Sequence, residues 1–229
     1  MYRSMARTIL YLAVPVLASL TAMAASKNGV TTGENGRRTI ASKPASQPFT
    51  PYVDSDAGLN TIFNNLGSAY PLGAYWCCSG GTISGPLSEI ETAFWEAAGF
   101  IPGSDGSITR IKVALGYVSG AAKDVILTLH EDAGGVPGAV LRRWKVTDMP
   151  AFRSCCEVST KKDRVGIPVT GGKLYWVAVS TEPTSDIWVS WNLNDTDQVN
   201  AIPSAFAQDG VWTSRVGGSH GFAFAVFGP

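Results

Sequence analysis

The chain has 229 residues, 18 Lys and Arg balanced by 18 Asp and Glu, and 45% hydrophobic residues. This length and apolar content allow a substantial core and exclude a wholly disordered protein. A formal net charge of zero argues against a protein that binds nucleic acid through a basic surface, and two histidines leave little material for a His-rich metal site.

Residues 1–24 have the features of a secretory signal peptide. Arg3 and Arg7 give a positive start, and residues 9–20 form an apolar run that is too short to span a bilayer comfortably. The segment ends in small residues, so we expect cleavage after Ala24 and a secreted or periplasmic protein. No later run is long and apolar enough for a transmembrane helix, and we expect no membrane span in the mature chain.

Residues 25–57 have the composition of a linker. They are rich in Pro, Ser and Thr and contain few large apolar side chains, so they cannot offset the entropy lost on ordering. We expect a disordered, extended arm that leads into one domain over residues 58–229.

From Leu59 onward, large apolar residues recur at every second position, which is typical of half-buried strands. Gly and Pro turns separate the runs, so the pattern predicts an all-β domain, an antiparallel β-sandwich or a jelly-roll-like fold. Residues 89–98 have helix propensity, but we interpret their second half as a strand because their neighbours are strands. The clearest alternating runs are residues 111–117, 125–130, 140–146, 174–179 and 222–227.

Several short motifs occur in a characteristic order along the domain. They are Phe63-Asn64-Asn65-Leu66-Gly67, Trp76-Cys77-Cys78, Thr82-Ile83-Ser84-Gly85, residues 113–120, Gly134-Gly135-Val136-Pro137-Gly138 and residues 223–228. Together they resemble the bacterial choice-of-anchor R domain over about residues 59–229. The resemblance implies an exported domain of unassigned biochemical function, and it brings no catalytic residues. Many members end in an anchoring segment, whereas this sequence stops at Pro229, so we expect an unanchored version.

The four cysteines form two adjacent pairs, Cys77-Cys78 and Cys155-Cys156. Oxidation is the default after export, and four cysteines allow three connectivities. We expect the two loops to lie side by side with at least one bridge between them. A vicinal bridge within each pair and a Cys₄ zinc site are the alternatives, although adjacent cysteines reach a tetrahedron poorly.

Catalytic motifs are weak in this sequence. Ser219 lies in a Gly-x-Ser-x-Gly string, but no acid and histidine follow it as a hydrolase requires, so we interpret the string as a turn. His130 ends a predicted strand beside Asp132, and we expect a surface histidine, with a base or metal ligand as the alternative. Glu89 and Glu91 are expected to be exposed acids rather than a glycosidase pair. We therefore predict a protein that is not an enzyme.

Two acidic clusters have oxygen ligands at short spacing and are candidates for a structural calcium ion, the only cofactor that we consider. The first contains Asp54 and Asp56, and the second contains Asp195 and Asp197. Solvated turns are the alternative.

The seven tryptophans give the best hint of function. Trp188 and Trp191 are three apart, so in a strand they face opposite ways, and one of them is expected to be exposed. Aromatic planes beside amides suit stacking on sugar rings. The predicted ligand site contains Trp188, Trp191, Asn192, Asn194 and Trp212.

The sequence thus favours an exported, non-enzymatic module for extracellular or cell-surface interaction. A carbohydrate-binding module that takes a glycan or a cell-surface polymer is the first alternative, and a secreted hydrolase is the second.

Overall fold

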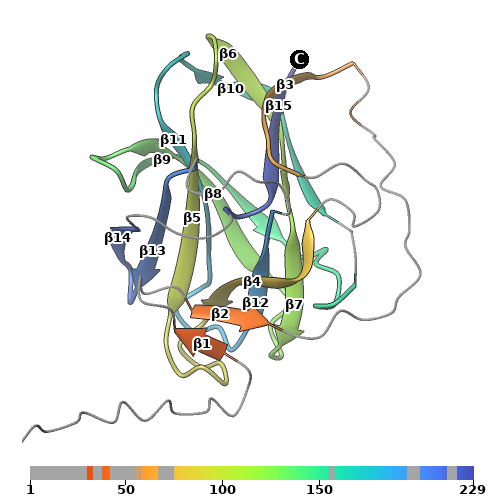
Figure 1. The fold of residues 1–229 in the computed structure, drawn as a ribbon, viewed down its shortest axis with the longest axis vertical. Coiled ribbons are helices and arrows are strands. Elements are labelled where there is room, and N and C mark those ends of the chain that lie inside the picture. Colours follow the sequence, from red (N-terminus) through yellow and green to blue (C-terminus); the bar gives the residue numbers. More distant parts are fainter. Residues whose placement is uncertain are drawn as a thin grey trace, which may run out of the picture.

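The computed structural model describes residues 30–32, 38–41, 56, 58–66, 75–154, 158–194, 202–215 and 221–229. All regular elements in these residues are strands, and every pairing between them is antiparallel (Figure 1). The strands form two packed sheets, which confirms the predicted all-β antiparallel sandwich.

The larger sheet has eleven strands in two halves, which meet where Ser84 of β4 pairs with Phe94 of β5. In the first, called the β5 half, the order is β9-β8-β11-β5-β13-β14. In the second, called the β12 half, it is β7-β12-β4-β2-β1. The bounds are β1 Val30–Thr32, β2 Arg38–Ala41, β4 Trp76–Ser84, β5 Phe94–Phe100, β7 Leu115–Ser119, β8 Val125–Asp132, β9 Pro137–Val146, β11 Tyr175–Ser180, β12 Trp188–Leu193, β13 Ser204–Gln208 and β14 Val211–Arg215.

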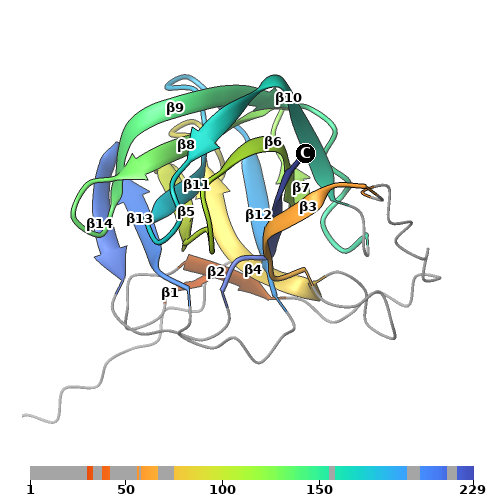
Figure 2. The ribbon, with the colours of Figure 1, turned by 90° about the horizontal axis from the view of Figure 1, so that it is seen from above.

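The smaller sheet has four strands in the order β10-β6-β15-β3. Their bounds are β3 Asn60–Asn64, β6 Gly106–Val113, β10 Ser159–Val169 and β15 Phe224–Gly228. Figures 1 and 2 place β3 and β15 on the opposite side of the molecule from β13 and β14. The strand expected over residues 111–117 is split at Ala114, whose N–H donates to the Ala223 carbonyl, so the chain passes there from the smaller sheet to the larger.

The main core lies between the two sheets and takes the inward positions of the alternating runs. Val113, Leu127 and Phe224 are each 0% exposed. Strand β11 is buried on both faces, because Val177 points into this core while Trp176 belongs to a second cluster on the outer face. Alternation usually indicates a strand with one buried and one solvent-exposed face. In β11, however, both faces are buried.

Strand β9 departs from its expected alternation at a bulge. Leu129 of β8 pairs with Arg142 of β9, and the next residue, His130, pairs with Val140. Leu141 is therefore the extra residue of the bulge. As a result Val140 is 57% exposed, whereas Leu141 packs against the main core.

Two short strands fall within residues 25–57, which the composition predicted to be a disordered linker. Strand β1 pairs with β2, and β2 adds to β4 through Thr39 opposite Gly81. The prediction is wrong for these residues, because backbone pairing to an existing sheet does not need large side chains. In contrast, the predicted strand in the second half of residues 89–98 is confirmed, since β5 begins at Phe94.

Candidate functional site

The outer face of the β5 half carries a second apolar cluster. Ala97 of β5 lies opposite Ala178 of β11 on one side and Ala205 of β13 on the other, and all three are fully buried. Small side chains at these neighbouring positions leave room for the Trp176 ring, which is 0% exposed and belongs to the same cluster. The indole Nε1 of Trp176 donates to Asp132 Oδ1 at 2.8 Å, which fixes the ring at the end of β8.

Trp212 packs against this cluster and against the ring of Trp95, and both tryptophans remain half-buried. Both pair with Ala207, so they lie on either side of β13, with ring centroids 6.3 Å apart and ring planes at 54°. Trp95 Nε1 donates to Thr181 Oγ1 at 3.3 Å, which fixes the orientation of that ring. The pair offers an aromatic surface that is both partly open to solvent and held in place.

The predicted ligand site at β12 is wrong because its side chains are interior. Trp191 is 0% exposed, stacks on Phe222 at 4.8 Å and donates from Nε1 to the Ala223 carbonyl at 3.0 Å. Trp188 is also buried, because every residue of β12 is buried and both faces of the strand are therefore covered. No sugar can stack on either ring without unfolding the strand.

The two amides of the predicted site are buried as well. Asn192 Nδ2 donates to the Ala114 carbonyl at 2.9 Å, where the chain crosses between the sheets. Asn194 is 0% exposed beside Gly221. Of the five predicted ligand residues, only Trp212 reaches the surface.

Asp56 is the one candidate calcium ligand among the described residues, and its carboxylate is already neutralised. Its two oxygens accept from Arg110 Nη1 and Lys112 Nζ of β6, and Asp56 and Lys112 are buried. A calcium ion at Asp56 would be repelled by these two cations or would have to displace one of them. Asp54, Asp195 and Asp197 lie outside the described residues. In the part of the chain that is described, no group of three or more His, Cys, Asp and Glu gathers to hold a metal.

His130 is buried, contrary to the surface position expected for it. Nδ1 lies 2.9 Å from the Gly138 carbonyl and Nε2 lies 2.7 Å from Thr128 Oγ1. A carbonyl only accepts, so Nδ1 carries the hydrogen and Nε2 accepts from the threonine hydroxyl. Burial lowers the pKa of His130 below its usual 6.5, which keeps the ring neutral. Asp132, its proposed helper, binds Trp176 instead.

Cys77 and Cys78 belong to strand β4, not to the loop expected for them, and the rest of the predicted disulfide pattern and the Gly-x-Ser-x-Gly serine fall outside the described part of the chain. Cys155, Cys156 and Ser219 lie outside the described residues, as do the side chains of Cys77 and Cys78. The residues just before the two cysteine pairs do meet, however. The hydroxyl of Tyr75 donates to the carbonyl of Ser154 at 3.1 Å.

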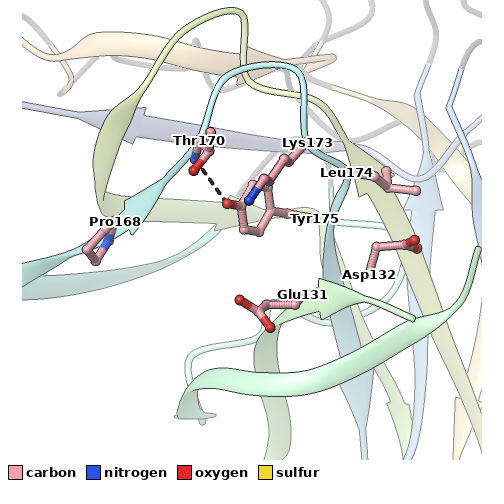
Figure 3. A pocket seen from close by; sticks show the side chains of 7 residues that line it. All are labelled: Glu131, Asp132, Pro168, Thr170, Lys173, Leu174 and Tyr175. Carbon is pink, nitrogen blue, oxygen red and sulfur yellow. Dashed lines mark hydrogen bonds between the residues drawn. The ribbon is translucent and has the colours of Figure 1, made fainter. Parts of the chain in front are cut away.

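A groove of about 490 Å³ opens where β8 ends and β11 begins (Figure 3). Glu131 and Tyr175 are paired across the two strands, so their side chains lie on one side of the sheet. The N–H of Thr170 donates to the Tyr175 hydroxyl at 2.9 Å, and Lys173 comes from the turn between β10 and β11. The groove is lined by Glu131, Asp132, Pro168, Thr170, Lys173, Leu174 and Tyr175.

Sequence reasoning missed this groove and the role of Trp95. Glu131 and Lys173 are 42 positions apart along the chain, and only the β8–β11 pairing brings them together. The Gly171-Gly172 turn before Lys173 was the one local signal.

Comparison with known proteins adds no identity. No family model, no curated protein and no solved structure matches the chain. The resemblance to the choice-of-anchor R domain therefore stays a prediction. Within the described residues, no helix has both the length and the apolar character needed to cross a membrane.

Proposed function

We propose that the protein is exported and acts as a non-enzymatic β-sandwich module that binds an extracellular or cell-surface partner. Its export is supported by the signal-like residues 1–24 and by four cysteines suited to an oxidising compartment. The resemblance to the choice-of-anchor R domain points the same way.

The non-enzymatic role is supported by what the buried ionisable side chains do. His130 forms hydrogen bonds with Thr128 of β8 and Gly138 of β9. Asp56 forms ion pairs with Arg110 and Lys112 of β6. Glu96 forms a buried two-point pair with Arg215, at 2.5 and 3.0 Å. Each of these ionisable side chains is bonded to another residue of the fold. Their engagement in structural contacts is the observation that carries the proposal of a non-enzymatic role.

Export is tested by expressing the full chain in a Gram-negative host and sequencing the N-terminus of the recovered protein. We expect protein in the periplasm or the medium that begins at Ala25. A charged substitution in the apolar run, Val16→Asp, serves as the control and should retain the protein inside the cell. Recovery of the native chain in the cytoplasm with Met1 in place would contradict the proposal.

A glycan is the partner that one observation favours. Trp95 and Trp212 present partly exposed rings with fixed geometry, and such rings stack on the apolar faces of sugars. A hydrogen-bonding group lies beside Trp95, whose indole Nε1 donates to Thr181 Oγ1, and the next residue, Glu182, pairs with Arg143 at 2.6 Å.

Glycan binding is tested on an array or by polysaccharide pull-down. Trp212→Ala should weaken binding by about tenfold, which corresponds to roughly 1.4 kcal/mol of stacking energy. Val211→Ala, on the exposed neighbour in the same strand, is the matched control and should bind like the native protein. A native protein that binds no glycan, or a Trp212→Ala variant that binds normally, would remove the glycan from the proposal.

A further inference from the structure

The groove at the end of β8 and β11 holds opposite charges that do not neutralise each other. Glu131 and Lys173 both line it, and neither takes part in an ion pair with another described residue. Arg143 and Glu182, by contrast, are both exposed and do pair with each other. The two charges therefore flank a space instead of closing it (Figure 3).

A rigid donor completes the groove. Tyr175 is 6% exposed, and its ring lies 6.0 Å from that of Phe100. Because its hydroxyl accepts from the N–H of Thr170, the hydroxyl position is fixed, and no described residue accepts its own hydrogen. That hydrogen remains available to a ligand.

The charge balance selects among small ligands. Glu131, Asp132 and Lys173 give the groove a formal charge of −1, so an acidic sugar would add a second unfavourable negative charge. A neutral sugar would leave Glu131 and Lys173 unpaired. An ammonium beside Glu131 and a carboxylate beside Lys173 and the Tyr175 hydroxyl satisfy all three groups.

We propose that this groove binds a small zwitterion of the amino-acid or dipeptide class, with its ammonium at Glu131 and its carboxylate at Lys173. A volume of about 490 Å³ lies within the usual range for small-molecule sites, roughly 300–1,000 Å³. The site is separate from the Trp95–Trp212 surface, so either proposal can fail alone.

The experiment is an NMR titration of the purified protein at low salt, because ion pairs at exposed sites are screened. The probe is dialanine, with N-acetylalanine and alanine amide as analogues that lack the ammonium or the carboxylate. We expect dialanine to shift the amide signals of Glu131, Thr170 and Lys173, and each blocked analogue to bind at least tenfold more weakly.

Two variants assign the charges, and both change exposed side chains. Glu131→Gln should abolish the preference for a free ammonium, and Lys173→Met should abolish the preference for a free carboxylate. Glu91→Gln, which removes an exposed carboxylate in the turn before β5, is the control and should leave binding unchanged.

Three results would overturn the proposal. The first is an absence of shifts at the groove with dialanine. The second is binding of dialanine that neither variant weakens. The third is tighter binding of glucosamine or galacturonic acid than of dialanine, which would assign the groove to a sugar.

Discussion

His130 is a buried titratable residue whose effect on stability has a definite sign. Since burial lowers its pKa in the folded protein below 6.5, the unfolded chain binds more protons over the pH range between the two pKa values. The free energy of unfolding should therefore fall as the pH drops below about 6.5. This loss should continue until the pH reaches the pKa of the folded protein.

Urea unfolding of the native protein and of His130→Gln, between pH 7.5 and 5, measures this effect. Glutamine keeps hydrogen-bonding groups but does not titrate, so the variant should lose less stability than the native protein over this range. Equal losses in the two proteins would show that His130 is not a neutral buried base.

Asp56 also acts at the scale of single residues, by neutralising the buried Lys112. Breaking a buried ion pair by removing one partner typically costs about 3–5 kcal/mol, and we expect Asp56→Asn to destabilise the protein by that order. Adding Lys112→Met should recover most of the loss, because the stranded charge is then gone. A cost below about 0.5 kcal/mol for Asp56→Asn in denaturant unfolding would contradict this account.

At the scale of elements, β4 and β12 approach each other more closely than side chains allow. A Cβ atom at Gly80 would lie 2.4 Å from the Trp191 carbonyl oxygen and 2.2 Å from Ser190 Oγ. Backbone cannot yield as a flexible side chain can, so Gly80→Ala should cost about 1–3 kcal/mol. The control is Gly106→Ala, where a Cβ would meet nothing within 4 Å. Thermal unfolding compares the two, and an equal change in Tm would refute the close approach.

Local patterns were enough to predict most of the strands. The runs that became β8 and β15 alternate strongly, so Leu127 and Phe224 could be assigned to the core from the sequence alone. Alternation does not show whether the other face is covered. That is why one of Trp188 and Trp191 was expected to be exposed although β12 buries both.

The candidate sites were harder to predict because they depend on pairing between distant strands. Trp95 and Trp212 become neighbours only because β13 inserts between β5 and β14. The same holds for the groove, where the end of β8 meets the start of β11. The Asp209-Gly210 turn marks the β13–β14 hairpin locally, but the pairings of β13 with β5 and of β8 with β11 have no local signature in the sequence.

At the scale of the whole molecule, the predicted cross-link between the cysteine pairs remains open to test. The bond from the Tyr75 hydroxyl to the Ser154 carbonyl brings together the residues that precede the two pairs, which favours a bridge between them. Such a bridge closes a loop of roughly 80 residues and would stabilise the fold by about 4–5 kcal/mol in the chain-entropy model.

Peptide mapping without reductant decides the connectivity. We expect a disulfide-linked species that joins a peptide containing Cys77 and Cys78 to one containing Cys155 and Cys156. Peptides linked only within each pair would show two vicinal bridges instead, and four free thiols would exclude cross-linking altogether.

The central claim is that the larger sheet is packed on both faces at the central strands of its β5 half, β8, β11 and β5, which leaves Trp95 and Trp212 partly open at the border of the outer cluster. Amide hydrogen exchange followed by mass spectrometry tests it most directly, because exchange in native conditions reports local opening. Strand β11 is paired on both sides and covered on both faces, so its amides should be among the slowest to exchange, and those of the edge strand β14 should exchange much faster. Exchange in β11 as fast as in β14 would contradict the account.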